Sequence, residues 1–267
     1  MIIEGTFDPI TESELEKIKQ IRYKKQCRSI YIKVNKKESL ISYEDRVKMV
    51  QKAIAPYRYM KLVYKGSADL ELKKFLNEEK EVREGQYIKA AKGLRKYIAE
   101  SGIYLKQTVD AMCKPKRAIH SQGVADTAVL LAKWHSLDVN RAYKMGMLHD
   151  VTKILSEAEG KKILSVWDRK DLVLDPKIWH SKTAIFVLKH QMGITDSKIL
   201  NAIWNHTTGY GKSNYARVLY IADKIEPNRG YDTTIQMHLA KKNLKEASFY
   251  ILKDSKRYIQ VKEGKNV

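Results

Sequence analysis

The sequence is poor in cysteine, the residue that builds disulfide frameworks and metal-thiolate sites. Its 267 residues include only Cys27 and Cys113, which lie far apart and form no CxxC pair. This spacing excludes a disulfide-stapled fold and a zinc knuckle. We therefore expect both thiols to be reduced and without a functional role.

Long apolar runs are also missing. No stretch approaches the roughly 20 apolar residues of a membrane-spanning helix, and the first residues lack the charged and apolar regions of a secretory signal. We find no internal repeat, low-complexity tract or long Gly/Ser linker. The sequence predicts a folded cytoplasmic protein with one large or two modest domains and no membrane segment.

Acidic residues are few relative to basic ones. The chain has 51 Lys and Arg against 31 Asp and Glu, a formal charge of +20, which attracts polyanions such as nucleotides, nucleic acid or anionic lipid. The lysines are spread over nearly every expected helix, and no dedicated nucleic-acid motif accompanies them. A basic nucleic-acid-binding protein is therefore the least favoured hypothesis for this chain. Such a protein would bind DNA or RNA in a salt-dependent way that survives metal removal.

The first part of the chain alternates short strands with helices. Residues 1–3, 29–34 and 59–64 have the composition and period of strands. Ser42 is a candidate N-cap for a helix through Ala55, and a further helix is expected from Ser67 or Asp69 to about Glu79. Strands separated by helices predict a parallel α/β sheet of the Rossmann-like type.

Beyond about residue 105 the strand signals stop and amphipathic helices follow one another. Pro115 suits the first turn of one helix, and Asp138 and Asp196 are candidate N-caps of two others. We therefore expect two domains, an α/β domain over residues 1–104 and an all-α helical bundle over residues 105–267. The change of period places the boundary between Ser101 and Gln107.

Polar residues end several apolar stripes in this helical half. His120 shares a helical face with Val124 and Leu131, for example. A single inward histidine needs only a hydrogen-bond partner, but six inward histidines and aspartates would carry a large desolvation cost without a cation. The pattern predicts a metal centre built from His120, His149, Asp150, His180, His206 and Asp223. His135, His190 and His238 lack this arrangement.

The donor types indicate the chemistry of such a centre. Imidazole nitrogens and carboxylate oxygens without thiolate suit iron, manganese, cobalt or zinc. Such an ion polarises a phosphoryl oxygen and lowers the pKa of a bound water, so that hydrolysis needs no Ser-His-Asp triad. A metal-dependent hydrolase is therefore the predicted class.

The motifs around these residues resemble the HD-domain superfamily of metal-dependent phosphohydrolases. The match rests on His120, the His149-Asp150 pair and Asp223. Over roughly residues 103 to 260 the sequence is similar to the bacterial symmetrical diadenosine tetraphosphate hydrolases. The similarity lies in the segments RAIHSQGVADTAVLLA, MLHDVTK, WHSKTA, AIWNHTTG and YIADKIEPNR.

This resemblance implies cleavage of diadenosine tetraphosphate into two ADP, with iron as the expected metal. The metal ligands would be His120, His149, Asp150 and Asp223, and the catalytic residues His149, Asp150 and Lys153. The phosphates and nucleoside would be contacted by Arg117, His120, Lys153, His180, His206, Thr207 and Arg229. His180 and His206 could instead hold a second metal, with Asp150 as the bridge. Each cation could also be an ordinary solvated charge.

The opening EGTFDPI, with ISYEDRVKMV and the GLR at 93–95, resembles the nucleotidyltransferases that make NAD or coenzyme A precursors. The resemblance covers roughly the first 100 residues. In that family two histidines follow the FDP segment, but this chain has Thr11 and Glu14 there, and Glu4 replaces a glycine. Glu14 would repel a triphosphate. We expect a structural or docking domain in preference to nucleotide sensing, and no adenylyl transfer.

The leading hypothesis is therefore a degenerate nucleotidyltransferase-like domain fused to an active HD phosphohydrolase that takes a dinucleoside polyphosphate. The first alternative keeps the hydrolase but changes its substrate to a nucleoside monophosphate, a cyclic dinucleotide or a guanosine polyphosphate. The second is a regulatory protein that binds metal and nucleotide without turnover. A homo-oligomer is compatible with all of these.

Overall fold

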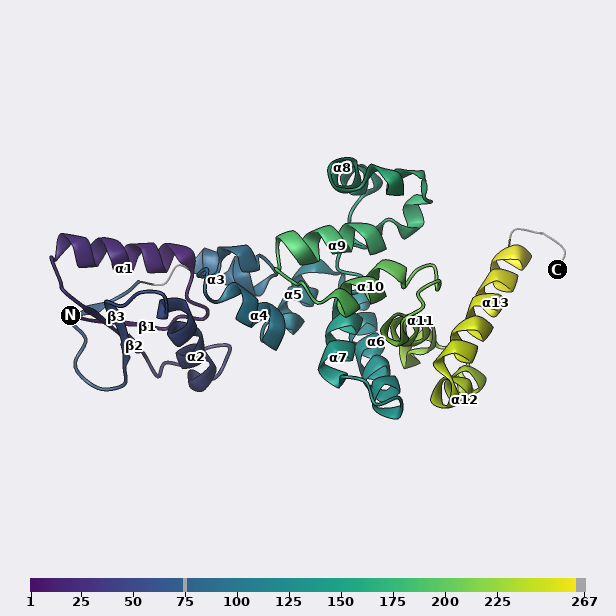
Figure 1. Cartoon of the computed structure of the whole chain (residues 1–267), viewed down its shortest axis with the longest axis horizontal. Helices are drawn as coiled ribbons and strands as arrows, with labels where there is room; N and C mark the ends of the chain where they lie inside the picture. The colour runs from purple at the N-terminus through teal and green to yellow at the C-terminus, as the bar shows by residue number, and fades with distance from the viewer. Residues whose placement is uncertain (74–75, 263–267) are drawn as a thin grey trace. The chain divides into compact units, whose positions relative to one another are not determined.

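The computed structural model describes residues 1–73 and 76–262 (Figure 1). The chain forms two compact units. The first contains Met1–Thr108 together with His190–Ile194, and the second contains Val109–Lys189 and the described residues from Thr195 on. The short α5 (Leu105–Met112) carries residues of both.

The first unit is built on a parallel sheet, as predicted. Its strands are β1 (Ile2–Gly5), β2 (Ile30–Val34), β3 (Met60–Val63) and β4 (Leu70–Glu71), in the order β3-β2-β1-β4. Ile3 lies opposite Ile32 in the neighbouring strand, and Ile32 lies opposite Leu62. Ile3 and Ile32 are fully buried, so the centre of the sheet is part of the core.

The edge strand β4 contradicts the helix predicted from Ser67 or Asp69. The N–H groups of Asp69 and Leu72 donate to the carbonyls of Ile2 and Glu4, and this pairing draws the segment onto the free edge of β1. The helix α3 begins only at Leu76 and ends at Arg83. Residues 74–75 of the predicted helix lie outside the described residues.

Helices connect the strands of this unit. Thr11 begins α1 by accepting a hydrogen bond from the Glu14 N–H, while the Glu14 carboxylate accepts from the Thr11 N–H, which is a capping box. Ser42 caps α2, as predicted. The helical elements are α1 (Glu12–Lys24), α2 (Tyr43–Ile54), α3 (Leu76–Arg83), η1 (Tyr87–Lys89) and α4 (Arg95–Ser101).

The regular elements of the second unit are all helices within its described residues, which confirms the predicted all-α bundle. Its α-helices are α6 (Pro115–Trp134), α7 (Val139–Leu148), α8 (Glu157–Trp167), α9 (His180–His190), α10 (Ser197–Asn205), α11 (Asn214–Ile225), α12 (Thr234–Lys242) and α13 (Leu244–Lys262). Three short 3-10 helices lie between them: η2 (Arg169–Val173) and η3 (Pro176–Ile178) between α8 and α9, and η4 (Pro227–Arg229) between α11 and α12.

Helix α6 packs closely against α7. A Cβ at Gly146 of α7 would lie 2.4 Å from the Cα of Ala125, so only glycine permits this approach. Val124 and Leu131 of α6 are fully buried. Figure 1 shows α6, α7, α10 and α11 as neighbours within the helical unit. Together with the first residue of α9, these helices and the residues that follow them carry the polar side chains considered next.

The described helices include none with both the length and the apolar character that a membrane crossing requires.

Candidate metal centre

The six polar residues singled out from the sequence come from five helices of the second unit and lie together. His149 and His206 occupy equivalent positions, because each is the C-cap of a short amphipathic helix, α7 or α10. His180 is the first residue of α9, His120 lies on α6 and Asp223 on α11. All six side chains are buried.

One group of ligand atoms forms around His149. Candidate ligand atoms of His120, His149 and Asp150 lie within 4.8 Å of one another. Asp223 joins this group, because its Oδ1 is 3.1 Å from His120 Nε2 and 3.8 Å from His149 Nε2. Two imidazole nitrogens and two carboxylates thus point at one buried volume.

A second group shares Asp150 with the first. Candidate ligand atoms of Asp150, His180 and His206 also lie within 4.8 Å of one another. Asp150 Oδ1 is 3.2 Å from His180 Nε2 and 3.5 Å from His206 Nε2, whereas its Oδ2 is 3.4 Å from His149 Nε2. One carboxylate therefore faces both groups, one oxygen to each.

Backbone carbonyls fix the orientation of two of the rings. Nδ1 of His149 donates to Gly146 O and Nδ1 of His206 donates to Ile203 O, both at 2.7 Å. Because a carbonyl only accepts, these contacts place the hydrogen on Nδ1 and leave Nε2 with its lone pair in a neutral ring. Among the described residues, the buried Nε2 of His149 has no hydrogen-bond partner. A buried lone pair facing carboxylates fits a metal ion.

His180 has the opposite arrangement. Its Nδ1 lies 2.9 Å from the Lys153 ammonium, which can only donate. Burial lowers the pKa of His180 to about 4, so the neutral ring carries its hydrogen on Nε2, which donates to Nε2 of His206 at 3.2 Å and also lies 3.2 Å from Asp150 Oδ1. In this arrangement His180 is a hydrogen-bond donor to His206 and lies beside Asp150.

Cationic side chains contact both carboxylates. Arg117 Nη1 is 2.9 Å from Asp150 Oδ2, and Arg229 Nη2 is 2.7 Å from Asp223 Oδ1. Lys224 adds a contact of 2.8 Å to the other oxygen of Asp223. Lys224 was not predicted as a site residue from the sequence, although its position directly after Asp223 was a usable signal. These cations are partly exposed and can turn toward a bound anion.

The charges of the site are reflected in the pKa values. Burial opposes ionisation of Asp150, but His149, His180 and His206 hold its pKa well below the usual range. Burial likewise opposes ionisation of Asp223, and Lys224, His120, His149 and Arg229 lower its pKa.

The basic groups of the site shift in opposite directions. Burial favours neutral His149, yet the two carboxylates raise its pKa. Burial lowers the pKa of Lys153. With both carboxylates ionised, the centre is negative at its middle and cationic at its rim.

Thr207 and a cavity lie beside this centre. Thr207 is half-buried, and its hydroxyl donates to Ser181 Oγ at 3.3 Å. A cavity of about 330 Å³ is lined by residues that include Lys153, Lys177, Trp179 and His180. Lys153 thus contacts the ring of His180 and also lines a volume of the size of a small ligand site.

Two further residues of this site were not predicted from the sequence. Glu226 is almost fully buried, and its Oε1 is 2.9 Å from His120 Nδ1, while its Oε2 accepts two hydrogen bonds from Asn228. A Cβ at Gly123 would lie 2.4 Å from that Oε2. Gly123 follows His120 by about one turn, and Glu226 follows Asp223 by three residues, so both could have been found from the positions of the ligands.

In the first unit, the residues that replace the expected histidines support local structure. Thr11 and Glu14 bind each other in the capping box of α1, and burial raises the pKa of Glu14 to about 8. The Asp8 carboxylate accepts from the hydroxyls of Tyr104 and Ser39. These polar groups are engaged in holding the turn.

Comparison with known proteins agrees with both halves of this description. Residues 117–228 match the HD domain family. A probable nicotinate-nucleotide adenylyltransferase/Ap4A hydrolase of Mycoplasma pneumoniae is 36% identical over 165 residues, which are 59% of this chain and 48% of that protein. The Mycoplasma genitalium protein of that name is 31% identical over 223 residues, 80% of this chain and 62% of the relative. The chain thus spans about half to three-fifths of these two relatives.

Two further matches are to proteins whose names contain an HD hydrolase or a tetraphosphatase. A crystal structure of a predicted HD superfamily hydrolase involved in NAD metabolism from Clostridium acetobutylicum shares 28% identity, with a TM-score of 0.55 over 61% of this chain and 88% of that one. The symmetrical bis(5'-nucleosyl)-tetraphosphatase of Bacillus subtilis is 31% identical over 150 residues, 55% of this chain and 81% of that protein. The chain therefore belongs to the HD-domain family of symmetrical bis(5'-nucleosyl)-tetraphosphatases, and it also contains a nucleotidyltransferase-like region.

Proposed function

We propose that this protein is a metal-dependent phosphohydrolase that cleaves diadenosine tetraphosphate symmetrically into two ADP. The observation that carries the proposal is the buried group of His120, His149, Asp150 and Asp223, which fits a divalent ion. The name of the Bacillus subtilis relative supports the substrate and the symmetrical cleavage.

The proposed ion is held by His120, His149, Asp150 and Asp223. The unpartnered Nε2 of His149 and the nitrogen-oxygen donor set fit iron, which we propose, and equally manganese, cobalt or zinc. When bound, the ion supplies Lewis acidity, which polarises a phosphoryl oxygen and makes a water molecule acidic. Metal analysis of the purified chain would identify the ion.

The cations of the rim would bind the substrate. Arg117 and Arg229 contact the ligand carboxylates at 2.9 and 2.7 Å and are partly exposed, so each can donate a second hydrogen bond to a phosphate oxygen. Lys153 borders both His180 and the cavity beside it. Its ammonium is placed to donate to a phosphate, which would stabilise the charge that develops on the leaving group.

The structure is compatible with two alternative roles for His180, His206 and Thr207. We propose that they contact the substrate, since His180 donates to His206 and lines the cavity. The alternative is a second ion between His180, His206 and Asp150. Metal content separates these possibilities, because the first predicts about one ion per chain and the second about two.

The test of the function is product analysis. The full chain, loaded with iron or manganese under reducing conditions, is incubated with diadenosine tetraphosphate, and the products are resolved by ion exchange. ADP alone is expected, whereas AMP with ATP would contradict symmetrical cleavage. His149→Ala and Asp150→Ala should abolish turnover, and His238→Ala, which removes an exposed histidine, should not.

Absence of turnover with the metal bound would overturn the assignment. It would favour another nucleotide substrate or the regulatory alternative, in which the site binds metal and nucleotide without hydrolysis. A panel of nucleoside monophosphates, cyclic dinucleotides and guanosine polyphosphates would then separate these two readings.

For the first half of the chain we propose a structural or docking role, with the domains divided at residues 1–104 and 105–267. The capping box of Thr11 and Glu14 supports this proposal, because neither side chain supplies the cation that adenylyl transfer needs. Incubation with ATP and nicotinate mononucleotide should give no dinucleotide. Formation of a dinucleotide would contradict the proposal.

A further inference from the structure

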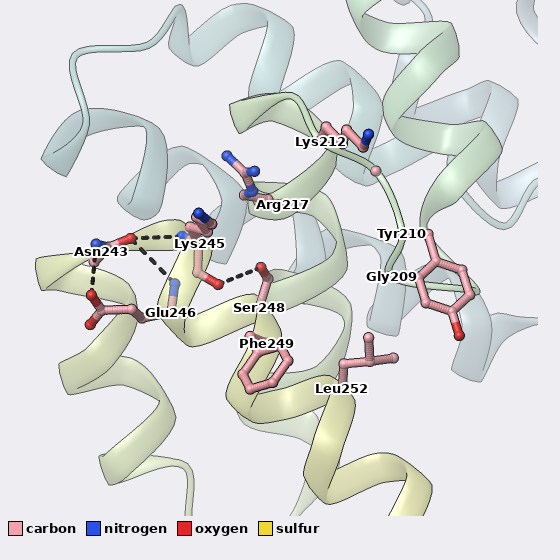
Figure 2. A pocket seen from close by; sticks show the side chains of 11 residues that line it. Gly209, Tyr210, Lys212, Arg217, Asn243, Lys245, Glu246, Ser248, Phe249 and Leu252 are labelled. Atoms are coloured by element: carbon pink, nitrogen blue, oxygen red, sulfur yellow. Dashed lines mark hydrogen bonds between the residues drawn. The ribbon is translucent and has the colours of Figure 1, made fainter.

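A second cavity of the helical unit is lined by no residue of the metal centre. It lies between the loop Gly209–Lys212 and the first turns of α13, and Figure 2 shows its lining side chains. Its volume is about 510 Å³, which is in the range of small-molecule sites.

The charge around this cavity is positive and poorly compensated. Lys212, Arg217 and Lys245 line it together with a single acidic residue, Glu246. The Glu246 carboxylate accepts a hydrogen bond from Asn243 Nδ2 at 3.0 Å, and Arg217 donates to Asn214 Oδ1 at 3.2 Å. Within the described part of the chain, the ammonium groups of both lysines lack a hydrogen-bond or ion-pair partner. The cavity therefore favours an anion.

Aromatic and apolar side chains complete the lining. Phe249 is 69% exposed, so a large apolar face is left in water beside the cations. Tyr210 is 63% exposed, with Lys256 Nζ 5.5 Å from the centroid of its ring. In the view of Figure 2, the charged ends of Lys212 and Arg217 lie on one side of the pocket and Phe249 and Leu252 on the other. This separation suits a ligand with an anionic end and a planar apolar end.

Local contacts support two walls of the cavity. Gly209 has a φ of +72°, and a Cβ there would lie 2.7 Å from the Tyr220 ring, so the loop rests directly on α11. On the opposite wall, Asn243 Oδ1 accepts hydrogen bonds from the N–H groups of Lys245 and Glu246. A preformed site loses less conformational freedom on binding.

We propose that this pocket binds a nucleoside phosphate, with the base against Phe249 and the phosphates among Lys212, Arg217 and Lys245. A planar base suits an exposed aromatic face, and two or three phosphate charges suit the uncompensated cations. A long single-stranded nucleic acid is a poorer fit, since the cavity is bounded by the loop and by α13. The proposal does not rest on the phosphohydrolase activity.

The test is a calorimetric titration of ADP into the full chain in the presence of a metal chelator. Phe249→Ala and the double variant Lys212→Ala/Lys245→Ala should each weaken binding by about tenfold or more, and Phe249→Tyr should retain it. The matched control Lys161→Ala/Lys162→Ala removes two exposed lysines of α8 and should bind as the wild type does. Thermal denaturation checks that each variant is folded.

Three results would overturn the proposal. One is wild-type affinity for ADP in both the Phe249→Ala and the double-lysine variants. Another is complete loss of binding in Asp150→Ala, which would place the nucleotide at the metal centre. The third is tight, steeply salt-dependent binding of a single-stranded oligonucleotide through these residues with no binding of ADP, which would identify an extended polyanion as the ligand.

Discussion

The carboxylate of Glu226 lies 2.9 Å from Nδ1 of His120, on the side of the ring opposite to Asp223. Glu226 therefore orients the ring, places its hydrogen on Nδ1 and leaves Nε2 to face Asp223 Oδ1 at 3.1 Å. Carboxylates in this position behind a metal-binding histidine increase its basicity and fix its tautomer. Glu226 is thus a positioning residue for the proposed metal ligand.

Glu226→Gln should weaken metal binding while preserving the shape of the side chain. The neutral amide is a weaker acceptor for the His120 N–H, and we expect a loss of about 10- to 100-fold in metal affinity. Chelator competition measures this affinity, and turnover at saturating metal should recover in part. Glu44→Gln, an exposed glutamate of α2, is the matched control. Unchanged metal affinity in Glu226→Gln would show that Glu226 only fills space.

Gly123→Ala should disturb the same contact from its other side. The new Cβ would lie 2.4 Å from Glu226 Oε2 and 2.7 Å from Asn228 Nδ2, so the carboxylate must move. We expect destabilisation of about 1–3 kcal/mol and weaker metal binding. Gly160→Ala is the control, because its Cβ would meet Trp179 at an ordinary 3.4 Å and should stabilise α8 by roughly 0.5–1 kcal/mol. Equal melting temperatures for the two variants would contradict the prediction.

The sequence predicted most elements because their signals are local. Ser42, Asp138 and Asp196 cap helices as expected, since a short polar side chain before an apolar stripe accepts from the helix's own N–H groups. The strand β4 could not be predicted in this way. Leu70 and Glu71 form a strand only because the edge of β1 offers them partners.

The same division applies to the metal centre. The helical stripes identified His120, His149 and Asp223 as inward-facing residues, and their bundle brings them together. The hydrogen-bond partners of Nδ1 in His149 and His206 could not be predicted. They are the backbone atoms Gly146 O and Ile203 O, which have no sequence signal. The orientation of His180 depends on Lys153, from another segment.

The stability of the first unit should fall as pH rises because of Glu14. Burial, with Glu79 and Glu78 nearby, raises its folded-state pKa from 4.5 to about 8. The folded state therefore binds the proton more tightly than the unfolded state does. This contribution is fully present below about pH 4.5 and is lost as pH rises to about 8.

Glu14→Gln tests this pH dependence. The amide oxygen can still accept from the Thr11 N–H, but it cannot ionise. At pH 9 we expect the free energy of unfolding of the variant to exceed that of the wild type by on the order of a few kcal/mol. At pH 4 the two values should be nearly equal. Urea denaturation at both pH values measures the difference. A gap of the same size at both pH values would contradict the assignment to Glu14 ionisation.

Arg117→Ala should reduce catalysis without removing the metal. Arg117 contacts Asp150 Oδ2 at 2.9 Å but supplies no ligand atom, and its partly exposed guanidinium can turn to a phosphate. Loss of such a charged hydrogen bond should lower kcat/KM by about 10- to 100-fold, at unchanged metal content. Lys116→Ala removes the neighbouring exposed cation and controls for net charge. An equal fall in kcat/KM in both variants would mean that the substrate is bound by general electrostatic attraction. It would rule out a specific contact with Arg117. Loss of the metal from Arg117→Ala alone would instead assign Arg117 to holding Asp150 in place.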